Sequence, residues 1–376
     1  MNTRTTFRYT FQAHCLAAAS ALALWFGGVP SNAVGEVTEV AQVPVVEKVA
    51  ARRDGLPRKV LVGTEVSGYD MILKLPLEKR FQRMDEIVDA MQAQASAKYP
   101  GKKLDLAVFV EYFMSRPFEA LEQQAVRFSD IADRIEACAK RHGCYLIVPI
   151  VLREEGEPAR YSNAAVLVDR EGHVAGMYRK VHPCTDLKYA SLEGGLTPGS
   201  NYPVFDCDFG RVGVEICYDV FYPEGWEALA KEGAEIVAFP SETPQTSRPS
   251  MYALQHRYYV VSATPRDHAA VYNPLGMIDA QATQEGEVLV HQIDLSYAIT
   301  GWESGLDGGE SLKRKYGDKV GYTYYNGEDA GIFWSNDPKT SIGQMFKAFG
   351  YPEPEDDTER SRMLQDKVRG GPPSRP

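Results

Sequence analysis

The feature that most constrains the fold of this chain is a series of short apolar runs that alternate with longer amphipathic stretches between residues 59 and 295. Leu104–Val110 and Tyr145–Leu152 are almost wholly apolar, as is typical of strands that are buried on both faces. Between residues 77 and 97, apolar side chains recur at helical spacing: Phe81, Met84, Ile87, Val88 and Met91. Because strands that alternate with helices form sheets covered by helices, the pattern predicts a single α/β domain.

The remaining elements follow the same alternation. A second helix is predicted over Ala120–Arg141, and a hairpin is predicted where Asn163–Val168 and His173–Tyr178 flank the turn at residues 169–172. A further helix is expected at residues 225–232, and further strands at residues 60–66, 212–216, 236–239, 258–263, near 277–278 and at 288–293.

The first 33 residues differ in composition from the rest of the chain. Arg4 and Arg8 form a positive segment, an apolar run extends from Cys15 to Val29, and Ser31-Asn32-Ala33 supplies a small-residue cleavage site. These are the parts of a secretory signal peptide, so we expect a protein that is secreted or periplasmic. The alternative is an uncleaved N-terminal anchor, although the apolar run is shorter than the ~20 residues that a membrane span needs.

Three further regions complete the predicted organisation. Residues 34–57 lack periodicity and are expected to be a linker, and the α/β domain is expected to occupy residues 58–296. Residues 297–376 are expected to form a C-terminal extension. Its first part, to residue 350, is rich in Gly, Tyr and Trp and has a weak pattern, while Glu353–Pro376 is charged, then rich in Gly and Pro, and is predicted to be a mobile tail.

Charge limits the expected partners. Cleavage of the signal peptide would leave 39 basic residues against 51 acidic ones, a net charge of −12. Such a surface repels phosphate backbones and anionic lipids, so neither nucleic acid nor, after signal cleavage, a membrane is an expected partner.

The predicted mature chain contains five cysteines, and export permits disulfides. If Cys217 stays free, Cys138 can pair with Cys144 and Cys184 with Cys207; the alternative is that all five are reduced. His182 and Cys184 together with Cys138, His142 and Cys144 would offer ligands for zinc. Their spacing matches no standard ligand pattern, so neither a metal nor another cofactor is expected.

Three short strings place side chains suited to catalysis at the ends of predicted strands. Glu111 directly follows the apolar run 104–110, Lys180 ends the string Tyr-Arg-Lys, and Cys217 lies between a predicted strand and a predicted helix. Taken one at a time, they have plain explanations: a solvated acid, a solvated cation and an inert buried cysteine. Taken together, they supply the acid, the cation and the thiol that nucleophilic catalysis needs.

The order and the residue sequences of these three motifs closely resemble those of the carbon–nitrogen hydrolase (nitrilase) superfamily. That family has a glutamate in Phe-Pro-Glu, a lysine in Tyr-Arg-Lys-x-His and a cysteine in Ile-Cys-Tyr-Asp-x-x-Phe-Pro-Glu; here Val110 replaces the proline. The resemblance covers roughly residues 59–295 and implies a four-layer αββα sandwich. It extends to Asn163, Thr197-Pro198-Gly199, residues 233–241 and Asn273-Pro274-Leu275-Gly276. The stretch 241–273 is shorter than is usual in the family, which implies a differently shaped pocket.

The resemblance also implies roles for individual residues. Cys217 would attack a carbonyl or nitrile carbon, Glu111 would transfer the protons, and Lys180 with the backbone N–H of Tyr218 would stabilise the oxyanion. Glu193 is the best match to a second glutamate of the family, which would orient the lysine or the attacking water.

Tyr112, next to Glu111, is the remaining candidate for a substrate contact. Tyr218-Asp219 stands where nitrilases generally have Trp-Glu, and so resembles the amidase and N-carbamoyl branches. We therefore expect a small amide, neutral or cationic, as the substrate and partner. The alternatives are a nitrilase or an N-acyltransferase of the same fold, and a non-catalytic secreted binding protein. Members of the family often pair near the active site, which leaves a homo-oligomer open as a further partner.

Overall fold

The computed structural model describes residues 54–116, 120–187, 190–303, 305–351 and 354–373. The predicted signal peptide and residues 34–53 of the predicted linker lie outside the described residues. No helix within the described ranges is long and apolar enough to cross a membrane.

The first of two six-stranded sheets contains the early strands and one late strand. Its members are β1 (Lys59–Glu65), β2 (Leu106–Val108), β3 (Tyr145–Arg153), β4 (Tyr161–Val168), β5 (Val174–Arg179) and β14 (Val288–Asp294). The order is β14-β1-β2-β3-β4-β5; β1, β2 and β3 are parallel, whereas β14, β4 and β5 pair antiparallel to their neighbours. The predicted hairpin is confirmed, because β4 and β5 flank a turn in which Gly172 has a φ of 89°.

The second sheet contains β8 (Val204–Cys207), β9 (Gly210–Val214), β10 (Ile236–Pro240), β11 (Tyr259–Ala263), β12 (Ala269–Tyr272) and β13 (Ile278–Ala282). Its order is β13-β12-β11-β10-β9-β8, with β9, β10 and β11 parallel. Of these strands, β8 and β12 are absent from the sequence prediction.

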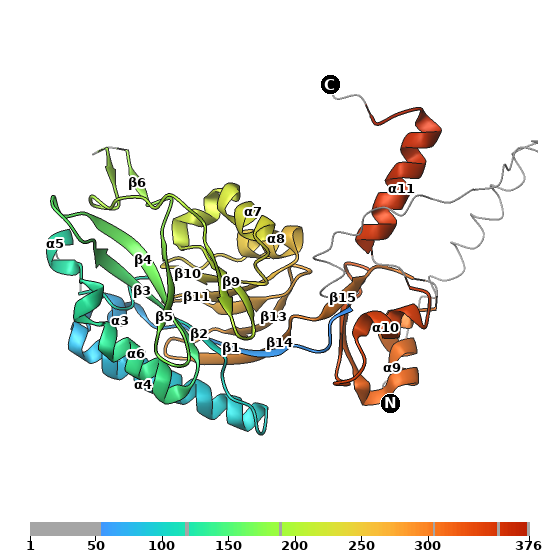
Figure 1. The fold of residues 1–376 in the computed structure, drawn as a ribbon, viewed down its shortest axis with the longest axis horizontal. Helices are drawn as coiled ribbons and strands as arrows, with labels where there is room; N and C mark the ends of the chain where they lie inside the picture. The colour runs from blue at the N-terminus through green and yellow to red at the C-terminus, as the bar shows by residue number, and fades with distance from the viewer. Residues whose placement is uncertain (1–53, 117–119, 188–189, 304, 352–353, 374–376) are drawn as a thin grey trace, which may run out of the picture. The chain divides into compact units, whose positions relative to one another are not determined.

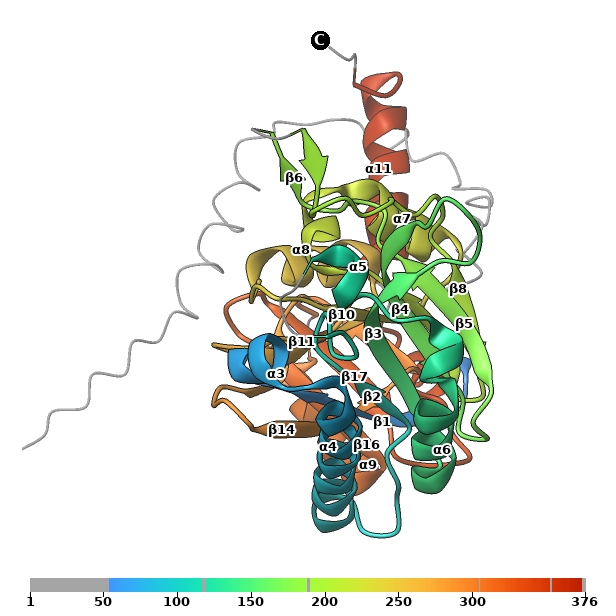
Figure 2. The ribbon, with the colours of Figure 1, turned by 90° about the vertical axis from the view of Figure 1, so that its left-hand side faces the viewer.

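The two sheets face each other across a shared apolar core, and helices cover both outer faces (Figure 1). Helices α4 (Leu77–Lys98) and α6 (Ala132–His142) pack on the first sheet. Helices α7 (Pro223–Lys231) and α8 (Ser247–His256) pack on the second sheet, where Trp226 and Tyr252 stack with ring centroids 4.5 Å apart. The turned view in Figure 2 shows the same succession of layers. The predicted four-layer αββα sandwich is confirmed.

The single helix predicted over residues 120–141 is wrong. The chain forms the short helix α5 (Leu121–Gln124), a 3-10 turn at Phe128–Asp130 and then α6. Between α5 and the turn, Val126 pairs with the edge of β3: its N–H donates to Val151 O at 2.9 Å, and Arg153 N–H donates to Val126 O at 2.8 Å. Pairing with a strand requires extended backbone, which interrupts the helix.

The prediction of weak structure for residues 297–350 is also wrong. This stretch forms a three-stranded sheet of β15 (Tyr297–Thr300), β17 (Ala330–Ser335) and β16 (Val320–Tyr325), with α9 (Glu310–Tyr316) and α10 (Ile342–Lys347). Its aromatic side chains build a separate small core in which Tyr322 stacks on Phe333. The remaining elements are α3 (Tyr69–Lys74), β6 (Thr185–Asp186), β7 (Ser191–Leu192) and α11 (Pro354–Arg369). Helix α11 lies where a mobile tail was predicted.

Cys138, Cys144, Cys184, Cys207 and Cys217 are all free thiols, so both predicted disulfides are wrong. Cys138, on the buried face of α6, and Cys144, between α6 and β3, both lie in the core between the helices and the first sheet. Cys184 follows β5 and lies close enough to Lys180 for the lysine charge to act on its thiol. Cys207 ends β8 and lies near Tyr145, which starts β3. The two cysteines of the second pair therefore lie toward opposite ends of the strands.

Candidate active site

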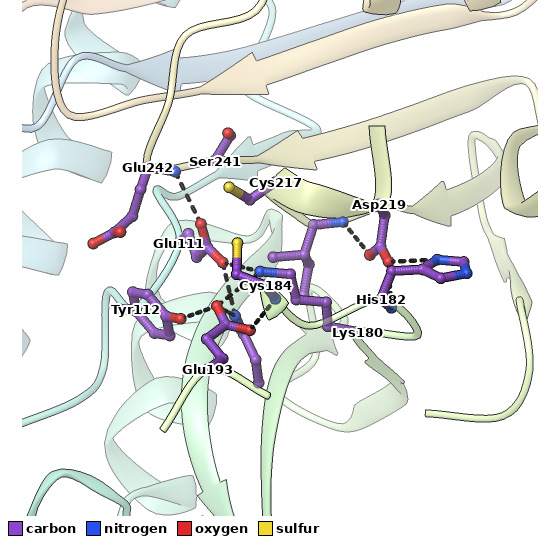
Figure 3. A network of polar contacts seen from close by, with 12 residues as sticks. Glu111, Tyr112, Lys180, His182, Cys184, Glu193, Cys217, Asp219, Ser241 and Glu242 are labelled. Atoms are coloured by element: carbon purple, nitrogen blue, oxygen red, sulfur yellow. Dashed lines mark hydrogen bonds and ion pairs between the residues drawn. The ribbon is translucent and has the colours of Figure 1, made fainter. Parts of the chain in front are cut away.

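The three strings that the sequence singled out converge at one edge of the sheets (Figure 3). Glu111 lies beyond the end of β2, Lys180 directly follows β5, and Cys217 follows β9. All three are almost inaccessible to solvent: the side chains of Lys180 and Glu111 are 0% and 1% exposed, and Cys217 is 9% exposed. Charged side chains are rarely buried to this degree unless they are paired with an opposite charge.

Lys180 is the central cation of the site. Its Nζ lies 2.9 Å from Glu111 Oε1 and 2.9 Å from Glu193 Oε1. Burial by itself lowers the pKa of Lys180, but attraction to Glu111, Cys217 and Glu193 outweighs burial and raises the pKa well above its ordinary value. Lys180 is thus a fixed ammonium that can donate hydrogen bonds but cannot act as a base near neutral pH.

Glu111 is held by donors on both of its oxygens. Asn163 Nδ2 donates to Oε1 at 2.7 Å, alongside Lys180, and the backbone N–H of Glu242 donates to Oε2 at 2.9 Å. Three donors from three different segments fix the orientation of the carboxylate.

Cys217 opens a 3-10 turn, Cys217–Phe221, with a φ of 45°. A non-glycine residue in this left-handed region is strained, and such strain concentrates at functional sites. The Cys217 Sγ lies 3.6 Å from Thr243 Oγ1. Burial, followed by repulsion from Glu111, raises the pKa of the thiol above its ordinary value, while Lys180 opposes the rise. The thiol is therefore protonated at rest and needs a base to become reactive.

Glu193 and Tyr112 share a hydrogen bond. The Tyr112 hydroxyl donates to Glu193 Oε1, and both residues have left-handed backbone, with φ of 63° for Tyr112 and 47° for Glu193. The sequence predicted Tyr112 as a substrate contact; the structure places its hydroxyl on the carboxylate that pairs with Lys180. Tyr218 turns its ring toward Phe221 and Tyr222, so its backbone N–H, in the first turn of the 3-10 helix, is the part available to the site.

Asp219 ties the lysine segment to the cysteine turn. Its carboxylate accepts hydrogen bonds from His182 N at 2.8 Å, Ile216 N at 2.9 Å and the Tyr178 hydroxyl at 2.8 Å. Because Asp219 is 0% exposed, these bonds are not shared with water. They fix Lys180, two residues before His182, relative to Cys217.

One group of three possible metal ligands occurs among the described residues, and it lies between α4 and α6, outside the site: Asp85, Cys138 and His142. Asp85 already pairs with Arg141, and burial raises the pKa of Cys138 to about 12. A protonated thiol and a paired carboxylate are poor ligands.

The carbon–nitrogen hydrolase family model matches residues 68–300, which is more than half of the chain. The chain belongs to the carbon–nitrogen hydrolase family. The match includes Glu111, Lys180, Glu193 and Cys217, together with both sheets except β1.

Individual relatives place this carbon–nitrogen hydrolase in the amidase-type branch of the nitrilase superfamily. It is 27% identical over 187 residues to omega-amidase NIT2 of Xenopus tropicalis, which covers 44% of this chain and 67% of the relative. It is 33% identical over 113 residues to the N-carbamoylputrescine amidase of Solanum lycopersicum, covering 29% and 35%. The chain spans about two thirds of the length of the omega-amidase relatives that it matches.

Solved structures show the same fold. Nit3 of Saccharomyces cerevisiae, a member of branch 10 of the nitrilase superfamily, superimposes with a TM-score of 0.52 at 20% identity, covering 64% of this chain and 91% of Nit3. A carbon–nitrogen hydrolase of Helicobacter pylori superimposes with a TM-score of 0.51 at 21% identity, covering 63% and 90%.

Sequence reasoning missed several residues that surround the predicted ones. Asn163 was visible only as part of a family-like string, although its amide bonds Glu111 directly. Ser241 was likewise visible only as the end of the family-like segment 233–241, and Glu242 and Thr243, which follow it in the loop after β10, carry no motif. Their position directly after a buried parallel strand was the one available signal.

Proposed function

We propose that this carbon–nitrogen hydrolase cleaves the C–N bond of a small, non-peptide amide through a thioester on Cys217. One observation carries the proposal: a buried lysine pairs with Glu111 and Glu193 at 2.9 Å, beside a buried cysteine on a strained turn. Burying so many ionisable groups is costly for a fold, and such clusters are characteristic of catalytic sites.

The first half of the reaction forms the thioester. Glu111 takes the thiol proton as Cys217 Sγ bonds to the carbonyl carbon, and the carbonyl oxygen becomes an oxyanion. Lys180 and the N–H of Tyr218 stabilise this charge. When the oxyanion collapses, the C–N bond breaks and Glu111 returns its proton to the departing ammonia or amine.

The second half releases the acid. Glu111 takes a proton from water, the resulting hydroxide adds to the thioester carbon, and the C–S bond breaks on collapse. The proton then returns to the Cys217 thiolate, so the enzyme is restored. Glu193 holds Lys180 in place through both halves, and Tyr112 holds Glu193.

The test is ammonia or amine release from a panel of small amides, N-carbamoyl amino acids and nitriles. We expect amides or carbamoyl compounds to be the best substrates, and Cys217→Ala to abolish their turnover without loss of the fold. Cys207→Ala, a half-buried thiol on β8 outside the site, is the matched control and should keep its activity. The proposal is contradicted if Cys217→Ala retains more than about a tenth of the wild-type rate, or if nitriles are turned over at least as well as every other compound.

A further inference from the structure

Glu242 is a further acidic residue at the reactive centre, and its carboxylate has no role in the proposed mechanism. It follows Ser241 at the end of β10, and its backbone N–H donates to Glu111 Oε2 at 2.9 Å. Within the described part of the chain, no hydrogen bond or ion pair engages its side-chain carboxylate. Figure 3 shows this side chain beside Glu111, and the dashed line to Glu111 starts from its backbone nitrogen. The backbone oxygen of Glu242 accepts a hydrogen bond from the Tyr69 hydroxyl at 3.2 Å.

The Glu242 carboxylate nonetheless interacts electrostatically with the charged groups of the site. Burial raises the pKa of Glu242 to about 7, repulsion from Glu111 and Glu193 adds to the rise, and attraction to Lys180 opposes it. The Glu242 charge in turn acts on Tyr112 and Cys184, which flank the same centre. The Glu242 carboxylate is therefore partly withdrawn from solvent and lies close enough to the reactive centre to interact with its charges.

Charge is unbalanced in this volume. Lys180 supplies one positive charge, and it is already paired with Glu111 and Glu193 at 2.9 Å. Glu242 adds a third carboxylate, so the groups named carry more negative than positive charge. A half-buried carboxylate without a partner is unfavourable, and a cationic group on the substrate would supply the missing partner.

We propose that Glu242 is a specificity residue that binds a cationic nitrogen of the substrate, so that the preferred substrate is a short amide bearing an ammonium group. This inference rests on the proposed function and narrows its substrate class. The ammonium would form a charge-assisted hydrogen bond with the Glu242 carboxylate while the amide carbon lies at Cys217. The same carboxylate would repel an amide that carries a carboxylate of its own.

The test compares matched substrates with wild-type enzyme. On the acyl side, γ-aminobutyramide is paired with valeramide, which has a methyl group in place of the ammonium. It is also compared with succinamate, whose chain is one methylene shorter and ends in a carboxylate. On the amine side, N-(aminopropyl)acetamide is paired with N-butylacetamide. We expect kcat/KM to be higher for the cationic member of at least one pair, and lowest for succinamate.

The variant Glu242→Gln removes the charge but keeps the backbone N–H that holds Glu111. We expect it to lower the ratio of cationic to neutral kcat/KM by roughly 10- to 100-fold, as is usual for a hydrogen bond to a charged group. Glu171→Gln, on the exposed hairpin turn, is the matched control and should leave the ratio unchanged. Glu242→Lys should reverse the preference, so that succinamate has a higher kcat/KM than γ-aminobutyramide.

The outcomes separate this inference from the proposed function. If amides are hydrolysed but neither pair shows a cationic preference, or Glu242→Gln leaves the preference intact, the assignment of Glu242 is overturned and the thioester mechanism stands. If none of the compounds, nor any amide of the wider panel, is hydrolysed, the proposed function itself fails.

Discussion

Replacing Lys180 by methionine should cost both activity and stability, and the stability cost should depend on pH. At an effective dielectric constant of about 20, each contact at 2.9 Å is worth roughly 6 kcal/mol of attraction before desolvation. Removing one member of a buried ion pair has a net cost of about 3–5 kcal/mol, because the remaining charge is left buried without its partner. Methionine nearly fills the lysine volume, so the change isolates the charge.

The sign of the pH dependence follows from proton linkage. Without the ammonium, one of the two acids, Glu111 or Glu193, must bind a proton in the folded variant that it does not hold in the unfolded chain near neutral pH. Folding then takes up a proton, so the stability of the variant rises as the pH falls toward the unfolded values near 4.3. The deficit relative to wild type should be about 3–5 kcal/mol at pH ~8 and clearly smaller at pH ~5.5.

Urea denaturation at the two pH values measures both deficits from the midpoint and the slope. The control is Lys74→Met, since Lys74 forms an exposed pair with Asp70 and both side chains are about 70% exposed. That change should cost less than about 1 kcal/mol at either pH. Amide hydrolysis by Lys180→Met should fall ~10²-fold or more. A variant as stable as wild type at pH ~8, or a deficit that does not change with pH, would refute this account of Lys180.

Three further outcomes are expected. Glu193→Gln should lower kcat roughly 10- to 100-fold with little change in KM, because it weakens the contact that positions Lys180 but removes no contact with the substrate. Steady-state kinetics in which only KM changes would argue against this role. Asp219→Asn should destabilise the fold by about 1–3 kcal/mol, measured by denaturation, because an amide NH₂ then faces one of the donors at His182 N, Ile216 N or Tyr178; no loss would mean that these bonds do not join the two segments. We also propose that the protein is exported, so N-terminal sequencing of exported material should find a first residue at or near Val34, whereas full-length protein confined to the cytoplasm would overturn the proposal.

The parts of the fold that depend on local pattern were predictable. The parallel strands β3, β10 and β11 are buried on both faces and read as unbroken apolar runs, and α4 shows its buried face at helical spacing. The break between α5 and α6 was not predictable, because it depends on Val126 pairing with Val151 and Arg153, far along the chain. Likewise the small C-terminal core depends on ring packing, which leaves no regular period in the sequence.

The candidate site likewise has some residues that the sequence predicts and others that only the structure reveals. Sequence motifs pointed to Glu111, Lys180 and Cys217, and the structure brings these three residues together. The motifs also placed Tyr112 nearby, but not its hydroxyl on Glu193, which is 81 residues away. The bond from Glu242 to Glu111 joins residues 131 positions apart and uses a backbone N–H, which any residue type possesses. Such a contact has no sequence signature, so the structure was needed to find it.

The central claim is that Cys217 carries the acyl group during turnover. The direct measurement is mass spectrometry of enzyme mixed with an excess of its best amide and quenched in acid within the first turnovers, followed by peptide mapping. The account predicts an adduct equal to the acyl group on the peptide that contains Cys217, and none in Cys217→Ala. Product formation without any adduct, or an adduct on the neighbouring thiol Cys184 instead, would contradict it.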